Sequence, residues 1–117
     1  MPRVLLVDDH ADVRLLWRVV LEAAGGYEIA EAGDGAAAIA EAAETRPDVV
    51  VTDLAMPVAS GFEVIRAIRA AYPGTVVVAC SGTDGEREAL DHGASAFLAK
   101  ERSVTDLAPT VVACLAR

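Results

Sequence analysis

Residues 48–53 read Asp-Val-Val-Val-Thr-Asp, an apolar run of β-branched residues that ends in an acidic side chain. Such a run is typical of a strand buried on both faces of a parallel sheet. Similar runs cover residues 4–7 and 76–81, a partly alternating stretch covers 27–32, and a last one covers 96–100. The sequence therefore predicts five strands.

Helical patterns fill the gaps between these strands. In the first gap, apolar residues recur at helical spacing at Val13, Leu16, Trp17, Val20 and Ala24. The other predicted helices cover residues 36–44, 61–71 with Ser60 or Gly61 at the start, and 86–91. Ser103 or Asp106 caps a last helix, and we favour Asp106. With that cap, Pro109 lies in the first helical turn, where no hydrogen bond is lost.

Strict alternation of strands and helices predicts an α/β fold, a doubly wound parallel sheet with right-handed crossovers. A chain of 117 residues has room for one domain, which we expect to span residues 1–117. We find no repeat, linker or low-complexity tail.

Composition excludes several classes of protein. Hydrophobic residues make up 54% of the chain, which is ample for a folded core. The longest apolar run is far shorter than the roughly 20 residues that span a bilayer, and no secretory signal opens the chain, so we expect a cytoplasmic protein without membrane contact. The net charge of −8 argues against direct nucleic-acid binding. Cys80 and Cys114 are expected to be buried free thiols.

Candidate reactive residues follow four of the five predicted strands. Ligands of such folds bind at the carboxyl ends of the strands, which all lie at one edge of the sheet. These ends carry Asp8 and Asp9, Asp53, Ser81, and Lys100, the only lysine in the sequence. Each residue alone has a commoner explanation, such as a helix cap or a turn. Their conjunction predicts one site.

This set of side chains matches phosphoryl transfer. Converging carboxylates repel one another, and a divalent cation relieves that repulsion. Carboxylate oxygens favour Mg²⁺ as the cofactor, and without thiolates or a second histidine Zn²⁺ is disfavoured. Asp53 can then act as the nucleophile, because aspartate forms acyl phosphates. Lys100 and the Ser81 hydroxyl can stabilise the charge of the transferred group.

The whole chain resembles the receiver domains of two-component response regulators. The matching motifs are Val-Asp-Asp at 7–9, Asp-Leu-Ala-Met-Pro at 53–57, Gly-Phe-Glu at 61–63, Ser-Gly at 81–82, Gly-Ala at 93–94 and Phe-Leu-Ala-Lys at 97–100. The resemblance implies a flavodoxin-like (βα)5 fold with strand order 2-1-3-4-5. It also implies a phosphorylation switch rather than an enzyme that turns over other substrates.

The resemblance assigns roles to individual residues. Asp53 accepts a phosphoryl group from a sensor histidine kinase or a phosphotransfer protein. Asp8, Asp9, Asp53 and the backbone carbonyl of Ala55 hold Mg²⁺. Ser81 is the switch hydroxyl and Lys100 contacts the phosphoryl group. Phe97 occupies the position of a switch aromatic, although ordinary core packing explains it equally well.

The sequence departs from the family at two places. Glu101 stands where the family usually has proline after the lysine, and the segment from Ser81 to Gly93 is short, so the fourth helix is expected to be a stub. Glu101 and the Asp-Asp-His motif at 8–10 resemble receivers attached to a helix-turn-helix output domain. An output domain or a homodimer would then be a further partner, although the short helix weakens the case for dimerisation through that face.

Three other functions are alternatives to this one. A pseudo-receiver would bind partners without phosphorylation, and Glu101 keeps that hypothesis open. A dehalogenase-type phosphatase needs a second acid two residues after the nucleophile, where this chain has Ala55. A dinucleotide-binding protein needs a glycine-rich turn after the first strand, where this chain has acids.

Overall fold

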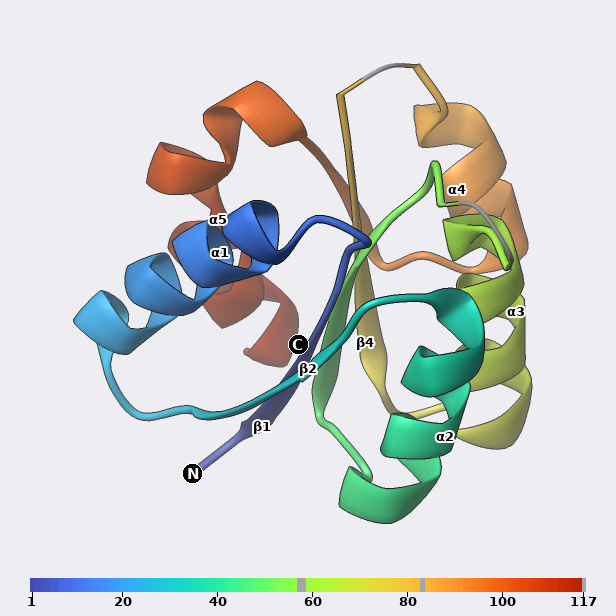
Figure 1. Ribbon diagram of the computed structural model, residues 1–117, viewed down its shortest axis with the longest axis horizontal. Helices are drawn as coiled ribbons and strands as arrows, with labels where there is room; N and C mark the ends of the chain where they lie inside the picture. The colour runs from blue at the N-terminus through green and yellow to red at the C-terminus, as the bar shows by residue number, and fades with distance from the viewer. Residues whose placement is uncertain (57–58, 83, 117) are drawn as a thin grey trace.

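Figure 1 shows a computed structural model that describes residues 1–56, 59–82 and 84–116. Pro57 of the predicted loop and Thr83 beside the predicted site lie outside the described residues. Strands and helices alternate as follows: β1 (Arg3–Val7), α1 (Ala11–Ala24), β2 (Glu28–Ala32), α2 (Gly35–Thr45), β3 (Val49–Asp53), α3 (Gly61–Ala71), β4 (Val76–Ser81), α4 (Glu86–His92), β5 (Ala96–Ala99), a 3-10 turn (Lys100–Arg102) and α5 (Ser103–Leu115).

The five strands form one parallel sheet in the order β2-β1-β3-β4-β5. This arrangement confirms the fold and the strand order predicted from the sequence. The register places Asp53 level with Cys80, and Ser81 level with Ala99. The carboxyl ends of the strands therefore share one edge of the sheet.

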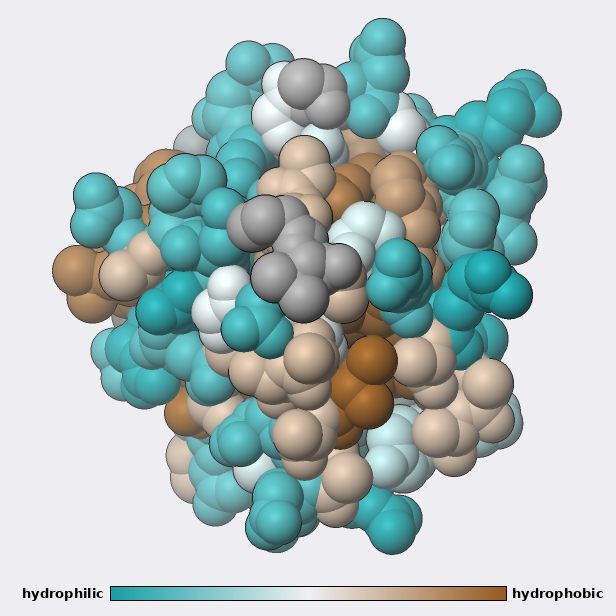
Figure 2. Space-filling view, turned by 45° about the vertical axis from the view of Figure 1, so that its right-hand side comes forward, coloured by the Kyte–Doolittle hydropathy of each residue, from teal (hydrophilic) through white to brown (hydrophobic). Residues whose placement is uncertain are grey.

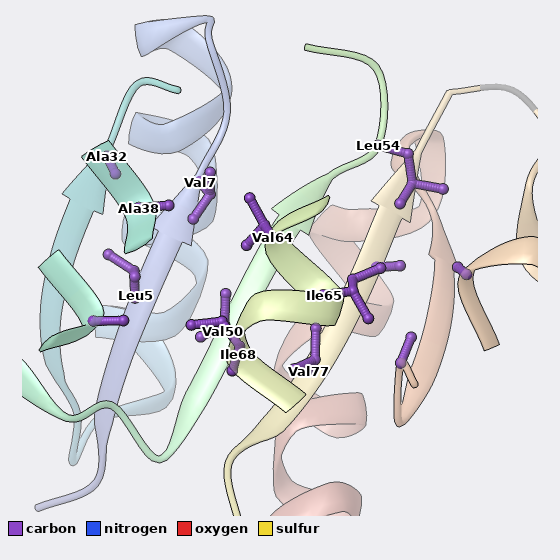
Figure 3. Close-up of a cluster of buried hydrophobic side chains, with 14 of the residues drawn as sticks. Leu5, Val7, Ala32, Ala38, Val50, Leu54, Val64, Ile65, Ile68 and Val77 are labelled. Carbon is purple, nitrogen blue, oxygen red and sulfur yellow. The ribbon is translucent and has the colours of Figure 1, made fainter. Parts of the chain in front are cut away.

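Helices cover both faces of the sheet. In Figure 1, α1 and α5 lie on one side, and α2, α3 and α4 lie on the other. Neighbouring residues of a strand point to opposite faces. Leu5 and Val50 therefore pack beneath α2 and α3, where Figure 3 shows them with Val64, Ile65 and Ile68.

The cluster beneath α1 and α5 contains the only tryptophan of the chain. Trp17 is fully buried there with Val4 and Leu6 of β1 and Val49 of β3. Its indole N–H has no hydrogen-bond partner among the described residues. Tight packing of the ring, rather than a polar contact, therefore fixes this side chain.

The start of α5 differs from the sequence prediction. The helix begins at Ser103 rather than after Asp106, and Pro109 lies inside it. Ser103 is buried, and its hydroxyl donates a hydrogen bond to the carbonyl of Lys100 at 2.7 Å. Pro109 and Thr105 are both exposed, so water can hydrate the Thr105 carbonyl that the proline leaves without a backbone donor.

The apolar side of α1 is also rotated from the predicted one. Leu16 was expected to face the core but is 41% exposed, whereas Leu21 is completely buried. The helix turns Trp17 and Leu21 toward the sheet, and its arginines Arg14 and Arg18 reach the neighbouring strand β2.

The face turned forward in Figure 2 mixes hydrophilic and hydrophobic residues, with small apolar patches between polar side chains. Among the described helices, none combines the length and the apolar character that crossing a bilayer requires.

Candidate functional site

The strand ends bring together three of the predicted residues. Asp8 follows β1, Asp53 ends β3, and Lys100 follows β5. The Lys100 ammonium lies 2.8 Å from Oδ2 of Asp8 and 3.4 Å from Oδ1 of Asp53. Both carboxylates are buried, at 0% and 3% exposure for the whole residues. One lysine therefore bridges two buried acids.

Burial and mutual repulsion set the protonation of this site. Burial raises the pKa of Asp53, the Lys100 charge works against that rise, and the Asp8 charge adds to it. Burial alone would lower the pKa of Lys100, but its hydrogen bond to Asp8 and the charge of Asp53 outweigh it, so that pKa is raised. Lys100 is therefore a permanent cation at neutral pH, and Asp53 is a poorly solvated carboxyl group.

The loop after β1 gathers further metal-ligand types. Ligand atoms of Asp8, Asp9 and His10 lie within 4.8 Å of one another. Nδ1 of His10 is 3.2 Å from a carboxylate oxygen of each aspartate, and its backbone N–H donates to Oδ1 of Asp8 at 2.8 Å. The group can hold a metal ion, as the sequence predicted for Asp8 and Asp9.

Ser81 lies at the same edge of the sheet as Asp53, and Phe97 lies further back on β5, level with Ala79. Ser81 ends β4 and is 3% exposed, whereas Phe97 on β5 is half-buried and packs against the cluster under α3. Both line a groove of about 840 Å³ that Glu101 and α4 also border. The fourth helix is indeed short, as the sequence predicted. The position of Phe97 between the core and the groove is compatible with either of its predicted roles.

Gly61 allows α3 to start directly against the end of β3. Its backbone N–H donates to the carbonyl of Leu54 at 3.0 Å. A Cβ atom at this position would lie 1.9 Å from the carbonyl oxygen of Asp53, much closer than any real contact. Because Gly61 has no side chain, the end of β3 and the loop that follows it can lie close to α3.

The thiol beside Asp53 in the sheet is unreactive at neutral pH. Cys80 is level with Asp53 in the sheet, free and completely buried. Burial raises the pKa of this thiol to about 12. It therefore stays protonated at neutral pH, and the protonated thiol is a poor nucleophile.

Two neighbours of the site were not among the predicted residues. They are His10, which the sequence marks only as part of the Asp-Asp-His motif, and Arg14, which no sequence motif marks. Arg14 donates to the backbone carbonyl of Asp8 at 2.5 Å and to Glu31 at 2.9 Å. An arginine on the first helix is usually a solvated cation, and only the tertiary placement of β2 gives this one its role.

Comparison with family models identifies one family. The model described as the response regulator receiver domain matches residues 4–111 of this chain. These residues include every side chain of the site described above.

Similar proteins agree with this match. The transcriptional regulatory protein PrrA of Mycobacterium leprae (strain TN) is 40% identical over 119 residues, which cover 99% of this chain and 51% of PrrA. The chemotaxis protein CheY of Thermotoga maritima is 35% identical over 102 residues, covering 84% of each. The solved structure of chemotaxis protein CheY4 of Vibrio cholerae superposes with a TM-score of 0.90 at 33% identity, covering 97% of this chain and 98% of CheY4. The chain spans about half the length of PrrA.

Proposed function

Because this chain belongs to the response regulator receiver domain family of two-component signalling, we propose that phosphorylation of Asp53 switches it between two states. The observation that carries the proposal is the buried Asp53 carboxylate at the end of β3, bridged to Asp8 by Lys100. The phosphoryl donor is a sensor histidine kinase or a phosphotransfer protein. Residues 1–117 act as a single domain.

The acidic residues fit a divalent cation. Lys100 pairs with the carboxylates of Asp8 and Asp53, and the Asp9 carboxylate lies in one cluster with Asp8 and His10. Oδ2 of Asp8 has no hydrogen bond beyond its contact with Lys100 within the described chain. This excess of negative charge suits Mg²⁺, held by the three acids and the backbone carbonyl of Ala55. When bound, Mg²⁺ offsets negative charge on the phosphoryl group.

The transfer step uses side chains that the fold already holds together. An oxygen of Asp53 attacks phosphorus, the bond between phosphorus and the imidazole nitrogen of the donor breaks, and the donor keeps the electron pair of that bond. Lys100 then shifts from Asp53 to the phosphoryl oxygens and remains close to Asp8. The Ser81 hydroxyl donates to the same oxygens.

New contacts to the phosphoryl group bias the conformation of the domain. Moving a two-state equilibrium from 1:99 to 99:1 takes about 5.5 kcal/mol. Hydrogen bonds to charged groups contribute about 1.5–3 kcal/mol each. Contacts from Ser81 and Lys100 therefore approach the required energy. In this proposal Phe97, which lines the groove beside α4, relays the change to that groove.

The output of the switch lies in a partner of this domain. A receiver domain accepts a phosphoryl group rather than turning over other substrates. Because PrrA is named a transcriptional regulatory protein, control of transcription is the first output to test. We place this signalling in the cytoplasm, where histidine kinases phosphorylate their receivers.

Intact-protein mass spectrometry after incubation with acetyl phosphate tests the proposal directly. We expect one added phosphoryl group with Mg²⁺ and none with EDTA. Hydroxylamine should remove the group, because it cleaves acyl phosphates and spares phosphate esters. Absence of the adduct, under conditions that label an active receiver domain, would overturn the proposal in favour of a pseudo-receiver that binds partners unmodified.

Replacing Lys100 with methionine should slow phosphorylation by about 10²-fold, the usual effect of losing one group that stabilises a transition-state charge. The variant leaves Asp8 and Asp53 without their shared cation. The rate of adduct formation from acetyl phosphate measures the effect.

Arg102→Gln is the matched control for this prediction. Arg102 is an exposed cation two residues further on, and it pairs with Asp106 rather than with the site. The Arg102→Gln variant should be phosphorylated by acetyl phosphate at the same rate as the wild type. Equal rates for wild type and Lys100→Met would show that Lys100 does not act on the phosphoryl group.

A further inference from the structure

Arg14 connects the acidic loop to the edge strand of the sheet. Its Nη1 donates to the backbone carbonyl of Asp8, and its Nε donates to Glu31 on β2 at 2.9 Å. The side chain is only 19% exposed. One guanidinium therefore holds two segments that are far apart in the sequence.

Glu31 is a firm anchor for this contact. Arg18, one turn further along α1, donates to its other carboxylate oxygen at 2.7 Å. The hydrogen bond from Arg18 and the contacts from Arg14 hold the pKa of Glu31 below its usual range, against the opposing effect of burial. Glu31 is therefore ionised at neutral pH and keeps both arginines in place.

The carbonyl that Arg14 holds belongs to the peptide between the two metal-ligand candidates. On the other side of Asp8, its backbone N–H donates to the carbonyl of Ala32 at 3.3 Å. The Asp9 side chain is 26% exposed, and its one ion pair within the described part of the chain is with His10. The direction of Asp9 is therefore set mainly by its backbone, which begins at the peptide that Arg14 fixes.

We propose that Arg14 is a positioning residue for the cation site, which sets the Mg²⁺ affinity of Asp8 and Asp9 by fixing the peptide between them. The inference rests on the proposed function and adds a residue to it. Mg²⁺ requires near-ideal octahedral geometry, so freedom of one carboxylate weakens its binding. Removing a residue that holds a metal ligand in place typically lowers the metal affinity by about 10- to 100-fold.

If the charge of Arg14 alone mattered, the change in Mg²⁺ affinity on replacing it would have the opposite sign. Arg14 is a cation beside a cation site, so its removal by a neutral residue would strengthen Mg²⁺ binding if charge alone mattered. Loss of positioning weakens binding instead. The sign of the change therefore separates the two roles without any need to measure phosphorylation.

The test compares Arg14→Gln with Arg18→Gln by isothermal titration of the apo protein with Mg²⁺. Both variants remove one cation from the same pair of arginines on Glu31, but only Arg14 contacts the Asp8 carbonyl. We expect about tenfold weaker binding for Arg14→Gln. Arg18→Gln should bind as the wild type does or slightly more tightly.

Two further measurements guard the conclusion. Urea unfolding without Mg²⁺ should show a comparable loss of stability for both variants, so that instability does not explain the difference in affinity. Arg14→Lys keeps the charge, but its single ammonium cannot reproduce both contacts, and it should also bind Mg²⁺ more weakly. If Arg14→Gln does not fold, the comparison of Arg14→Lys with Arg18→Lys decides the question.

The possible outcomes are distinct. Equal or tighter Mg²⁺ binding by folded Arg14 variants would overturn the positioning role while leaving the proposed function intact. A wild type that binds no Mg²⁺ and takes no phosphoryl group would instead overturn the proposed function. Weaker binding by both Arg14 variants, with unchanged binding by the Arg18 variants, supports the inference.

Discussion

Replacing Asp53 with asparagine is expected to abolish phosphorylation and at the same time to stabilise the metal-free domain. The amide cannot form an acyl phosphate, so the adduct from acetyl phosphate should disappear. In the folded protein, the ionised Asp53 carboxylate is poorly solvated and lies close to Asp8. Asparagine has nearly the same shape and no charge, so it removes that unfavourable charge.

The gain in stability has a defined pH dependence. Because the pKa of Asp53 is raised in the folded state, the wild type loses stability as the pH rises from the ordinary aspartate pKa of about 3.9 through the raised value. The asparagine variant does not have this loss. Its advantage should therefore be present at neutral pH and vanish near pH 3, with a size of about 1 kcal/mol, the typical effect of one substitution.

Thermal unfolding in EDTA measures this difference. Asp91→Asn, a change of the same kind at an exposed position on α4, is the control and should leave the unfolding temperature unchanged. Mg²⁺ should reduce the difference in unfolding temperature between Asp53→Asn and the wild type, because it stabilises the wild type by binding the folded state. A variant less stable than the wild type at neutral pH without Mg²⁺ would show that the ion pair with Lys100 outweighs the burial of Asp53.

Replacing Gly61 with alanine is expected to destabilise the domain by about 3 kcal/mol or more, at or above the upper end of the usual range for overpacked positions. The added Cβ would lie 1.9 Å from the Asp53 carbonyl oxygen and 2.6 Å from Cα of Leu54. Both are backbone atoms, which no side-chain rotation can move away. Relief therefore requires α3 to move from the end of β3, which also displaces Asp53.

Gly74→Ala is the matched control for this substitution. A Cβ at Gly74 would have no atom within 4 Å. This variant should have wild-type stability or gain a little, since alanine reduces the freedom of the unfolded chain. Urea unfolding compares the two. A Gly61→Ala protein as stable as the Gly74→Ala protein would contradict the close approach of α3 to the end of β3.

Periodicity predicted the elements well where local pattern and tertiary packing agree. The apolar runs at β3 and β4 have no other plausible structure, so these strands fell where they were expected. Helix details depended on packing instead. Pro109 favours a late start for α5, but burial of Ser103 and Leu107 outweighs that local preference. Likewise, the rotation of α1 is set by the fit of Trp17 against the sheet, which periodicity alone does not determine.

The candidate site divides in the same way. Asp8, Asp53 and Lys100 could be found from the sequence because strand ends share one edge in this fold. The backbone carbonyl of Ala55 and the switch role of Phe97 remain predictions from the family resemblance. The role of Arg14 could not be found, because it depends on how α1 lies against β2 and on a backbone carbonyl that no sequence pattern marks.

The single lysine of the sequence has a practical consequence for chemical labelling. Lys100 is the only side-chain amine of the chain, and its ammonium is held between two carboxylates. Because those contacts raise its pKa, acylating reagents should react with it slowly in the resting protein. Any event that draws Asp8 or Asp53 away from Lys100 changes that reaction rate. The acylation rate of Lys100 therefore reports on the contacts between this lysine and the two carboxylates of the site.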